Sequence, residues 1–229
     1  MKHEHGSAIA TVVSEQVLEL EASGTTQERS ALLRRLVPAA SEVWVDDPEP
    51  EIEEVLADLQ FSASRDLYKL GRQLPVGEGF ELDTRAFLPG KDDEAWLRVN
   101  NAAFAWHREQ GGWTQADLDA RMAEDWFDPK GFLLHERGGQ LAGFCWTKIH
   151  RHEMPPVGEI YVIAADQAFH GVGLGRRLTL AGLDHIASQG IKQAILYVDA
   201  DNAPAVRLYD TLGFERLVTR RLHLPTRSD

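Results

Sequence analysis

His170-Gly171-Val172-Gly173-Leu174-Gly175-Arg176 is a glycine-rich turn between two regular segments of the chain. A β-branched apolar run at residues 160–165 precedes it, and apolar residues at helical spacing follow it at 178–188. Alternate glycines allow positive φ angles that turn several backbone N–H groups toward one point, and the start of a helix adds unpaired N–H groups and the positive end of its dipole. This order of strand, turn and helix predicts a phosphate-binding site in an α/β protein.

The composition predicts a globular protein with an acidic surface. The 229 residues are 43% hydrophobic, which is enough for a buried core, and the formal net charge is -12 at pH 7. Nonspecific binding to nucleic acid or to an anionic membrane needs a positive field, so we expect neither as a partner. An anionic ligand has to be held locally instead, by backbone N–H groups with help from Arg176 and Arg177.

The single cysteine and the start of the chain predict the cellular setting. Cys145 has no second cysteine with which to form an intramolecular disulfide, and we expect it to be a buried small apolar residue. The first ten residues lack the apolar core of a signal peptide, and no apolar run approaches the roughly 20 residues that span a bilayer. We therefore expect a cytoplasmic protein, and a monomer. His150 and His152 flank Arg151 without an evident third ligand, so we expect no metal.

Turn and cap residues divide the chain into two parts. In the first part, residues 8–20 place apolar side chains at helical spacing, and Thr26 is placed to cap a helix at 27–36. The next expected element is a strand at 43–46. After it we expect a helix that begins at Pro48 and Pro50 and runs through residue 59, and then an extended segment at 64–74. Residues 75–79, Pro-Val-Gly-Glu-Gly, have the composition of a linker. The expected domains are therefore residues 1–76 and residues 79–229.

The second part is predicted to be a mixed α/β domain with mostly antiparallel strands. It is expected to begin with a strand at 80–85, a helix at 92–104 and a helix capped by Thr114. A hairpin follows, and Gly138-Gly139 joins its strands at 132–136 and 141–150. A strand at 157–165 leads into the glycine turn, and the expected helix after it runs over 174–189. A strand at 193–198, a helix capped by Asn202 and a strand at 214–224 complete the domain.

The ends of the two parts resemble each other. Val43-Trp44-Val45-Asp46 matches Leu196-Tyr197-Val198-Asp199, and Asp58-Leu59-Gln60-Phe61 matches Thr211-Leu212-Gly213-Phe214, at one offset without a gap. This similarity predicts an internal duplication. The first copy has no glycine at the place of the phosphate-binding turn, and we expect a truncated half domain that packs without catalysing. Chance similarity of two strand-helix-strand units is the alternative.

The glycine turn resembles the signature of the GNAT acetyltransferases. A dinucleotide fold would place an acidic ribose-binding residue on a following strand, and the strands before this turn look antiparallel. The GNAT pattern Arg/Gln-x-x-Gly-x-Gly/Ala falls on residues 170–175, with His170 where Arg or Gln is usual. The resemblance implies a GNAT fold with acetyl-CoA as cosubstrate. Its pyrophosphate would lie on His170, Gly171, Val172, Gly173, Leu174, Gly175 and Arg176, and its pantetheine arm would pair like a strand with Ile163, Ala164 and Ala165.

The second GNAT signature is an Asn followed seven residues later by Tyr and then by Gly-Phe, here Asn202, Tyr209 and Gly213-Phe214. Seven residues make two helical turns, so Asn202 and Tyr209 project from one face of a helix. The resemblance implies that Tyr209 protonates the departing CoA thiolate, although an amphipathic core tyrosine would show the same spacing. The implied CoA contacts on this helix are Asn202, Ala203, Pro204, Ala205, Val206 and Arg207.

Glu159 lies on the strand that leads into the glycine turn and alternates there with Tyr161 and Ile163. A carboxylate at this place resembles the general base of many GNAT members, which takes a proton from the attacking amine directly or through water. A solvated strand carboxylate is the alternative.

A narrower resemblance is to the mycothiol synthases, a branch of the GNAT family in which the fold is duplicated and the C-terminal copy is active. It rests on the sequences WHREQGGWT at 106–114, DWFDP at 125–129, GFCWTK at 143–148 and LYVD at 196–199. It implies acetylation of the cysteinyl amine of a cysteine, glucosamine and inositol conjugate to give mycothiol. The implied acceptor contacts are Glu109, Lys148, Glu159 and Tyr197.

Three departures from the family pattern keep alternatives open. Gln167 stands where Pro is usual, Val172 replaces a basic residue, and most of the first GNAT copy is absent. Glu109 and Lys148 could also be ordinary loop and strand-edge charges. The alternatives are a GNAT enzyme that acetylates another small amine or a protein N-terminus, and a CoA-binding module without catalysis.

Overall fold

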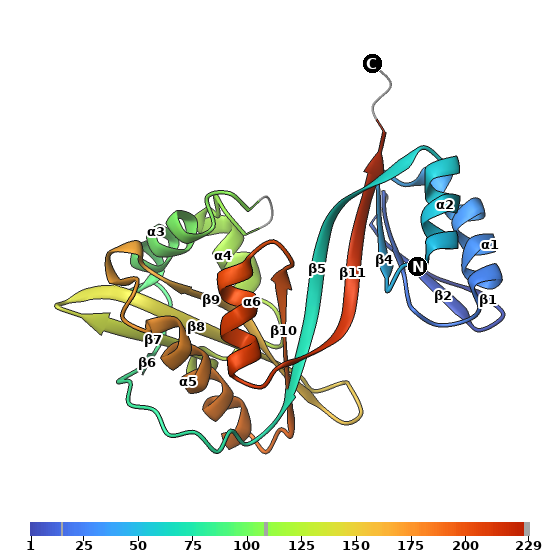
Figure 1. Ribbon diagram of the computed structural model, residues 1–229. Helices are drawn as coiled ribbons and strands as arrows, with labels where there is room; N and C mark the ends of the chain where they lie inside the picture. Colours follow the sequence, from blue (N-terminus) through green and yellow to red (C-terminus); the bar gives the residue numbers. More distant parts are fainter. Residues whose placement is uncertain (15, 108–109, 227–229) are drawn as a thin grey trace. The chain divides into compact units, whose positions relative to one another are not determined.

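The chain forms two compact units in the computed structural model, which describes residues 1–14, 16–107 and 110–226 (Figure 1). Unit 1 comprises Met1–Leu70 and Tyr197–Asp229, and unit 2 comprises Gly71–Leu196. The boundaries of these units follow from which residues lie close together in space. The expected domains, residues 1–76 and 79–229, follow from the sequence duplication instead, and this division stays a prediction.

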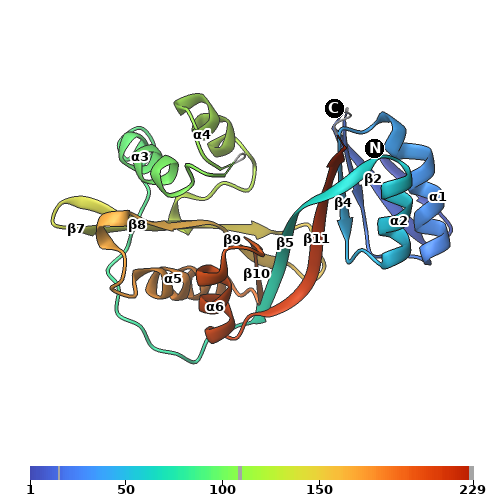
Figure 2. The same ribbon diagram turned by 45° about the horizontal axis from the view of Figure 1, so that its top comes forward.

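Unit 1 contains a sheet, two helices that pack on it and a third helix from the later part of the chain. Its strands follow the order β1-β2-β3-β4-β11-β5. Leu32 and Leu33 of α1 and Ile52 and Leu56 of α2 are buried with apolar residues of the strands, so both helices cover one face of this sheet (Figure 2). The elements are β1 (Lys2–His5), β2 (Ala8–Ser14), β3 (Val17–Leu20), α1 (Thr26–Leu36), β4 (Glu42–Asp46), α2 (Pro50–Asp58), β5 (Phe61–Gln73), α6 (Ala203–Thr211) and β11 (Glu215–Pro225).

The helix expected over residues 8–20 is wrong. Ala8–Ser14 and Val17–Leu20 are strands that pair antiparallel, because the β-branched residues of this segment favour strands and burial alternates, as at Leu18 and Leu20. The next helix begins one residue earlier than expected. Its cap is Thr25, whose hydroxyl accepts from the N–H of Glu28 while the Glu28 carboxylate accepts from the N–H of Thr25.

The bounds of the elements agree with the predicted duplication. Helix α2 at Pro50–Asp58 and helix α6 at Ala203–Thr211 are equally long, each has proline in its first turn, and one sequence offset relates both of their ends. Strand β4 precedes α2 as β10 precedes α6, and β5 and β11 follow the two helices.

Unit 2 is a mixed sheet flanked by helices on both faces. Its strands follow the order β10-β9-β8-β7-β6, and β9 pairs parallel with β10 while the other neighbours pair antiparallel. Helices α3 and α4 lie on one side of β8 and β9, and α5 lies on the other (Figure 2). The elements are β6 (Arg85–Ala86), α3 (Asp93–Ala103), α4 (Gln115–Met122), β7 (Phe132–Arg137), β8 (Gln140–His150), β9 (Val157–Ala165), α5 (Leu174–Ser188) and β10 (Gln193–Asp199), of which β10 continues into unit 1 at Tyr197.

Local sequence explains most of these elements. The hairpin turn at Gly138-Gly139 has positive φ at both residues, and Thr114 caps α4 through a reciprocal pair of hydrogen bonds with Asp117. The strand expected at 80–85 is much shorter, since only Arg85 and Ala86 pair with β7. The core between α3 and the sheet is aromatic: the ring of Trp96 contacts Phe132 and Trp146 edge-on at centroid distances of 5.5 and 5.8 Å.

Strand β9 is irregular in its middle. Trp146 pairs with Val162 and the next residue, Thr147, pairs with Ile160, so Tyr161 has no direct partner on β8. Such a bulge bends a strand and redirects the side chains beside it. The bend lies between Glu159 and the end of β9 that enters the glycine turn.

Candidate active site

The glycine turn has the geometry that anion binding needs. Gly171 and Gly173 have φ values of 80° and 72°, and Gly173 is the N-cap of α5 without a side-chain capping bond. Gly173 offers no side-chain acceptor to the N–H groups of the first turn of α5, and the helix dipole at this end favours a negative ligand. Leu174 is buried and fixes the start of the helix, whereas Val172 is 47% exposed beside it.

Side chains around the turn hold it in place. The His170 imidazole Nε2 lies 3.0 Å from the carbonyl oxygen of Ala165, which ties the turn to the end of β9. Arg177 donates to the carbonyl oxygen of Val172. Arg176, an expected phosphate contact, donates to both carboxylate oxygens of Glu78 at 3.0 and 2.6 Å. A phosphate would therefore compete with Glu78 for Arg176.

The residues expected to receive the pantetheine arm form the last part of β9. On one edge, Ile163, Ala164 and Ala165 pair with β8 through Cys145, Phe144 and Gly143 in register. Ile163 and Ala165 are half-buried and Ala164 is buried. This stretch follows the bulge at Tyr161 and ends before the turn, so it connects Glu159 with the N–H groups of the turn.

Glu159 is a buried carboxylate with a specific partner. It is only 7% exposed, which does not fit the alternative of a solvated strand charge. Its Oε2 lies 2.6 Å from Nε2 of His150 on the neighbouring strand β8. An N–H from His150 leaves the second carboxylate oxygen, Oε1, for a reacting group.

Lys148 is the cross-strand neighbour of Glu159 on β8. Its Nζ lies 4.6 Å from the centre of the Trp126 ring and 5.7 Å from that of Tyr161, so the ammonium group packs on two aromatic faces. A pocket of about 580 Å³ opens beside it and is also lined by His150 and His185. Burial lowers the pKa of His185, which favours its neutral form.

The second signature lies in unit 1. The Asn202 side chain accepts from the N–H of Ala205 at 3.3 Å and caps α6, as expected. The first part of α6 contains the other expected CoA contacts of this segment, which are Ala203, Pro204, Ala205, Val206 and Arg207. Tyr209 on the same helix is 6% exposed, and its ring meets that of Phe214 at 5.7 Å between centroids. Tyr197 on β10 is 37% exposed.

The structure thus brings one group of expected residues together. Glu159, Lys148 and the glycine turn belong to unit 2, whereas Tyr197, Asn202 and Tyr209 belong to unit 1. Glu109 lies outside the described residues. Sequence reasoning considered His150 only as a metal ligand and missed its bond to Glu159. This bond depends on the register in which β8 and β9 pair, and the spacing of residues within one strand does not reveal that register.

Other candidate chemistry is weaker. Within residues 1–14, 16–107 and 110–226, no group of three or more His, Cys, Asp or Glu side chains is arranged to hold a metal ion. Cys145 is fully buried, as expected, and burial raises the pKa of its thiol far above the usual range. No helix in the described part of the chain is long and apolar enough to cross a membrane.

Comparison with known proteins places this geometry in a family. The profile of the Acetyltransferase (GNAT) family matches residues 98–214. Mycothiol acetyltransferase of Acidimicrobium ferrooxidans is 42% identical over 222 residues, which cover 93% of this chain and 72% of that protein. The chain belongs to the GNAT family and, within it, to the mycothiol acetyltransferases. The GNAT fold predicted from the sequence is confirmed.

A second relative agrees with this assignment, and a solved structure agrees with the fold. Mycothiol acetyltransferase of Frankia alni is 47% identical over 196 residues, 77% of this chain and 58% of that protein. A solved GCN5-related N-acetyltransferase of Sphaerobacter thermophilus superposes with a TM-score of 0.66 at 20% identity, covering 95% of this chain and 76% of the other. The chain spans only 58% and 62% of the length of the mycothiol acetyltransferases of Frankia alni and Thermobispora bispora.

Proposed function

We propose that this chain transfers the acetyl group of acetyl-CoA to the cysteinyl amine of a cysteine, glucosamine and inositol conjugate, which gives mycothiol. The observation that carries the proposal is the 42% identity to a mycothiol acetyltransferase over 93% of the chain. The buried carboxylate on the strand that leads into the glycine turn supports it, because a base and a phosphate site joined by one strand suit acetyl transfer from a CoA thioester.

The turn and the end of β9 bind and orient the cosubstrate. The N–H groups of the turn at Gly171 and Gly173 and of the first turn of α5 hold the pyrophosphate, with Arg176 exchanging Glu78 for phosphate. Backbone groups of Ile163, Ala164 and Ala165 align the pantetheine arm, and an N–H near Ile163 donates to the carbonyl oxygen as negative charge develops there.

Glu159 receives the proton of the attacking amine. The amine nitrogen forms a bond to the acetyl carbon, the bond from carbon to sulfur breaks, and its electron pair leaves on sulfur. Oε1 of Glu159 takes the ammonium proton directly or through water, while His150 holds Oε2. An unperturbed α-amino group has a pKa of about 7.7 to 8.0, so part of the acceptor is already neutral near pH 7 and orientation supplies much of the rate.

Tyr209 donates its phenolic proton to the departing thiolate in this proposal, and it regains a proton from solvent. Lys148, Glu159, Tyr197 and Glu109 contact the acceptor. We further propose that the protein works as a soluble cytoplasmic monomer on a small-molecule amine, without metal or nucleic acid.

Charge reversal tests the acceptor assignment. Lys148→Glu combined with Glu109→Lys should abolish acetylation of the mycothiol precursor while acetyl-CoA still binds, as measured by product mass and by calorimetry. Unchanged acetylation by this variant would show that the acceptor site is wrongly assigned and would favour another amine.

The short length of the chain relative to its family favours one further candidate, a CoA-binding module without catalysis. Calorimetry with acetyl-CoA and a thiol-release assay separate the two. Binding without release of CoA thiol, across a panel of amines that includes the precursor, would favour the module.

A further inference from the structure

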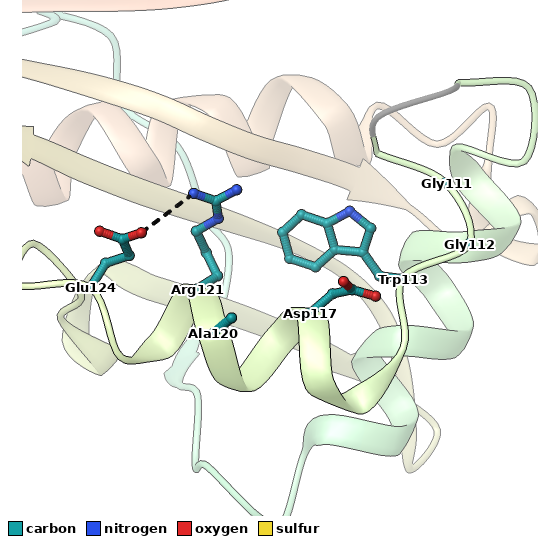
Figure 3. A pocket seen from close by; sticks show the side chains of 7 residues that line it. All are labelled: Gly111, Gly112, Trp113, Asp117, Ala120, Arg121 and Glu124. Atoms are coloured by element: carbon teal, nitrogen blue, oxygen red, sulfur yellow. Dashed lines mark ion pairs between the residues drawn. The ribbon is translucent and has the colours of Figure 1, made fainter. Parts of the chain in front are cut away.

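Helix α4 carries a second pocket that the proposed mechanism does not use (Figure 3). Its volume is about 420 Å³, within the range of small-molecule sites. Its functional side chains are those of Trp113, Asp117, Arg121 and Glu124, and the rest of the lining consists of Gly111, Gly112 and Ala120. Asp117, Arg121 and Glu124 follow helical spacing and so lie on one side of α4 and its C-terminal end.

The pocket combines an aromatic face with donors and acceptors. The Arg121 guanidinium lies between two rings, 5.9 Å from the centre of Trp113 and 5.8 Å from that of Tyr161. Its Nη1 is 3.9 Å from the carboxylate of Glu124, which is beyond hydrogen-bonding range, so these N–H groups can donate to a ligand. Hydrogen bonds from Thr114 lower the pKa of Asp117, which keeps this acceptor ionised.

This chemistry suits a ring that carries several hydroxyl groups. Carboxylates accept hydrogen bonds from hydroxyls, a guanidinium donates to them in pairs, and an indole face covers the C–H side of such a ring. The charged side chains are Asp117, Glu124 and Arg121, so acidic groups outnumber basic ones in the lining. A phosphorylated ring would be repelled, and a neutral polyol fits better.

The pocket adjoins the proposed reaction centre. Glu124 lines this pocket and also the pocket beside Lys148 and His150. Tyr161 contacts both Arg121 and Lys148, and it is two residues from Glu159 on the same strand, a distance of about 7 Å along an extended chain. A molecule with its amine at Glu159 could therefore reach α4 along the ring of Tyr161.

We infer that the pocket on α4 binds the neutral polyol ring of the acceptor, with Arg121 and Glu124 contacting its hydroxyl groups and Trp113 covering one face. This inference rests on the proposed function, since it assigns the part of the acceptor remote from the amine. Binding energy at such a remote ring holds the amine in place and determines which amines are acetylated efficiently.

A cycle of variant and substrate tests it. Arg121→Met keeps the aliphatic stem and removes the donors, and Arg137→Met is the matched control on the exposed hairpin. With the full conjugate, Arg121→Met should lower kcat/KM about tenfold, mainly through KM, because hydrogen bonds to a charged group are lost. With cysteinamide, which lacks both rings, Arg121→Met should match wild type within about twofold. Equal losses on the two acceptors would overturn the inference.

A binding measurement separates this inference from the proposed function. Millimolar myo-inositol should shift the indole N–H signal of Trp113 in the NMR spectrum of the free protein, inositol phosphate should shift it less, and Arg121→Met or Glu124→Gln should weaken the response. No shift in wild type, or a stronger response to the phosphate, would overturn the polyol site. If wild type acetylates neither acceptor, the proposed function fails while this binding result still decides the inference.

Discussion

At the scale of single residues, the proposed chemistry depends on the geometry of Glu159. Its place on the strand before the turn could be predicted from the sequence, because alternation with Tyr161 and Ile163 fixes its strand and face. Its burial and its bond to His150 could not, since they depend on how β8 and β9 pair. A bulge at Tyr161 shifts that pairing by one residue, and no pattern within one strand reveals the shift.

Glu159→Gln should slow acetylation most at low pH. Below about pH 7.7 the acceptor amine is mainly protonated and needs a base, whereas above that pH it is increasingly neutral. The variant should lose about 100-fold in kcat/KM near pH 6.5 and progressively less toward pH 9, with Glu94→Gln on the surface of α3 as control. A loss of equal size at every pH would contradict the role of Glu159 as the base.

Tyr209→Phe should keep the fold and slow the reaction. The ring and its contact with Phe214 remain, and only the proton donor is lost. We expect kcat to fall by about 100-fold in steady-state thiol release, with little change in the melting temperature. Tyr68→Phe makes the same chemical change elsewhere in unit 1 and should leave kcat unaltered. Wild-type turnover by Tyr209→Phe would identify the phenol as a core side chain only.

At the scale of elements, most helices and strands of unit 2 could be predicted because caps and turns mark their ends. Thr114 and Gly138-Gly139 have the roles expected from the sequence, and so does Asn202 in unit 1. The first strands of unit 1 were missed, because apolar residues in two short strands also fit helical spacing. The β-branched side chains of residues 8–20 are the feature that favours two strands over one helix.

Gly173→Ala tests the turn as an element. Gly173 has a φ of 72°, where an alanine costs about 1 to 2 kcal/mol, so the turn should relax and its N–H groups should diverge. Acetyl-CoA should bind about tenfold more weakly in calorimetry. Gly139→Ala changes a glycine with a φ of 76° in the hairpin and should lose similar stability without a change in affinity. Equal affinities of the two variants would argue against phosphate binding at this turn.

At the scale of the molecule, an ion pair between Arg85 and the buried carboxylate of Asp92 helps to hold unit 2 together. Asp92 is 5% exposed and accepts from both terminal nitrogens of Arg85, at 2.6 and 2.8 Å, and from the N–H of Leu88. The hydrogen bonds from Arg85 lower the pKa of Asp92 below its usual value. The two compact units themselves could not be predicted from the sequence, because β10 and β11, late in the chain, continue into the unit that the first residues build.

Asp92→Asn should therefore destabilise the protein in a pH-dependent way. A carboxyl whose pKa is lower in the folded state stabilises the fold above the unfolded value, about pH 4, and this contribution disappears as pH falls through the folded value. The variant should lose about 2 kcal/mol at pH 7 in denaturant unfolding, and the difference from wild type should shrink below pH 4. Asp125→Asn, an exposed residue of unit 2, is the control. A deficit that persists unchanged at pH 3 would contradict this account.

Acetyl transfer to the mycothiol precursor by the intact chain tests the central claim most directly. The measurement is kcat/KM for CoA thiol release with acetyl-CoA and a panel of the precursor, polyamines, an aminoglycoside and a peptide N-terminus, with the product identified by mass. We predict that the precursor exceeds every other amine by at least about 100-fold and gains one acetyl group on its cysteinyl nitrogen. Equal rates across the panel, or acetyl-CoA binding without thiol release, would contradict the claim.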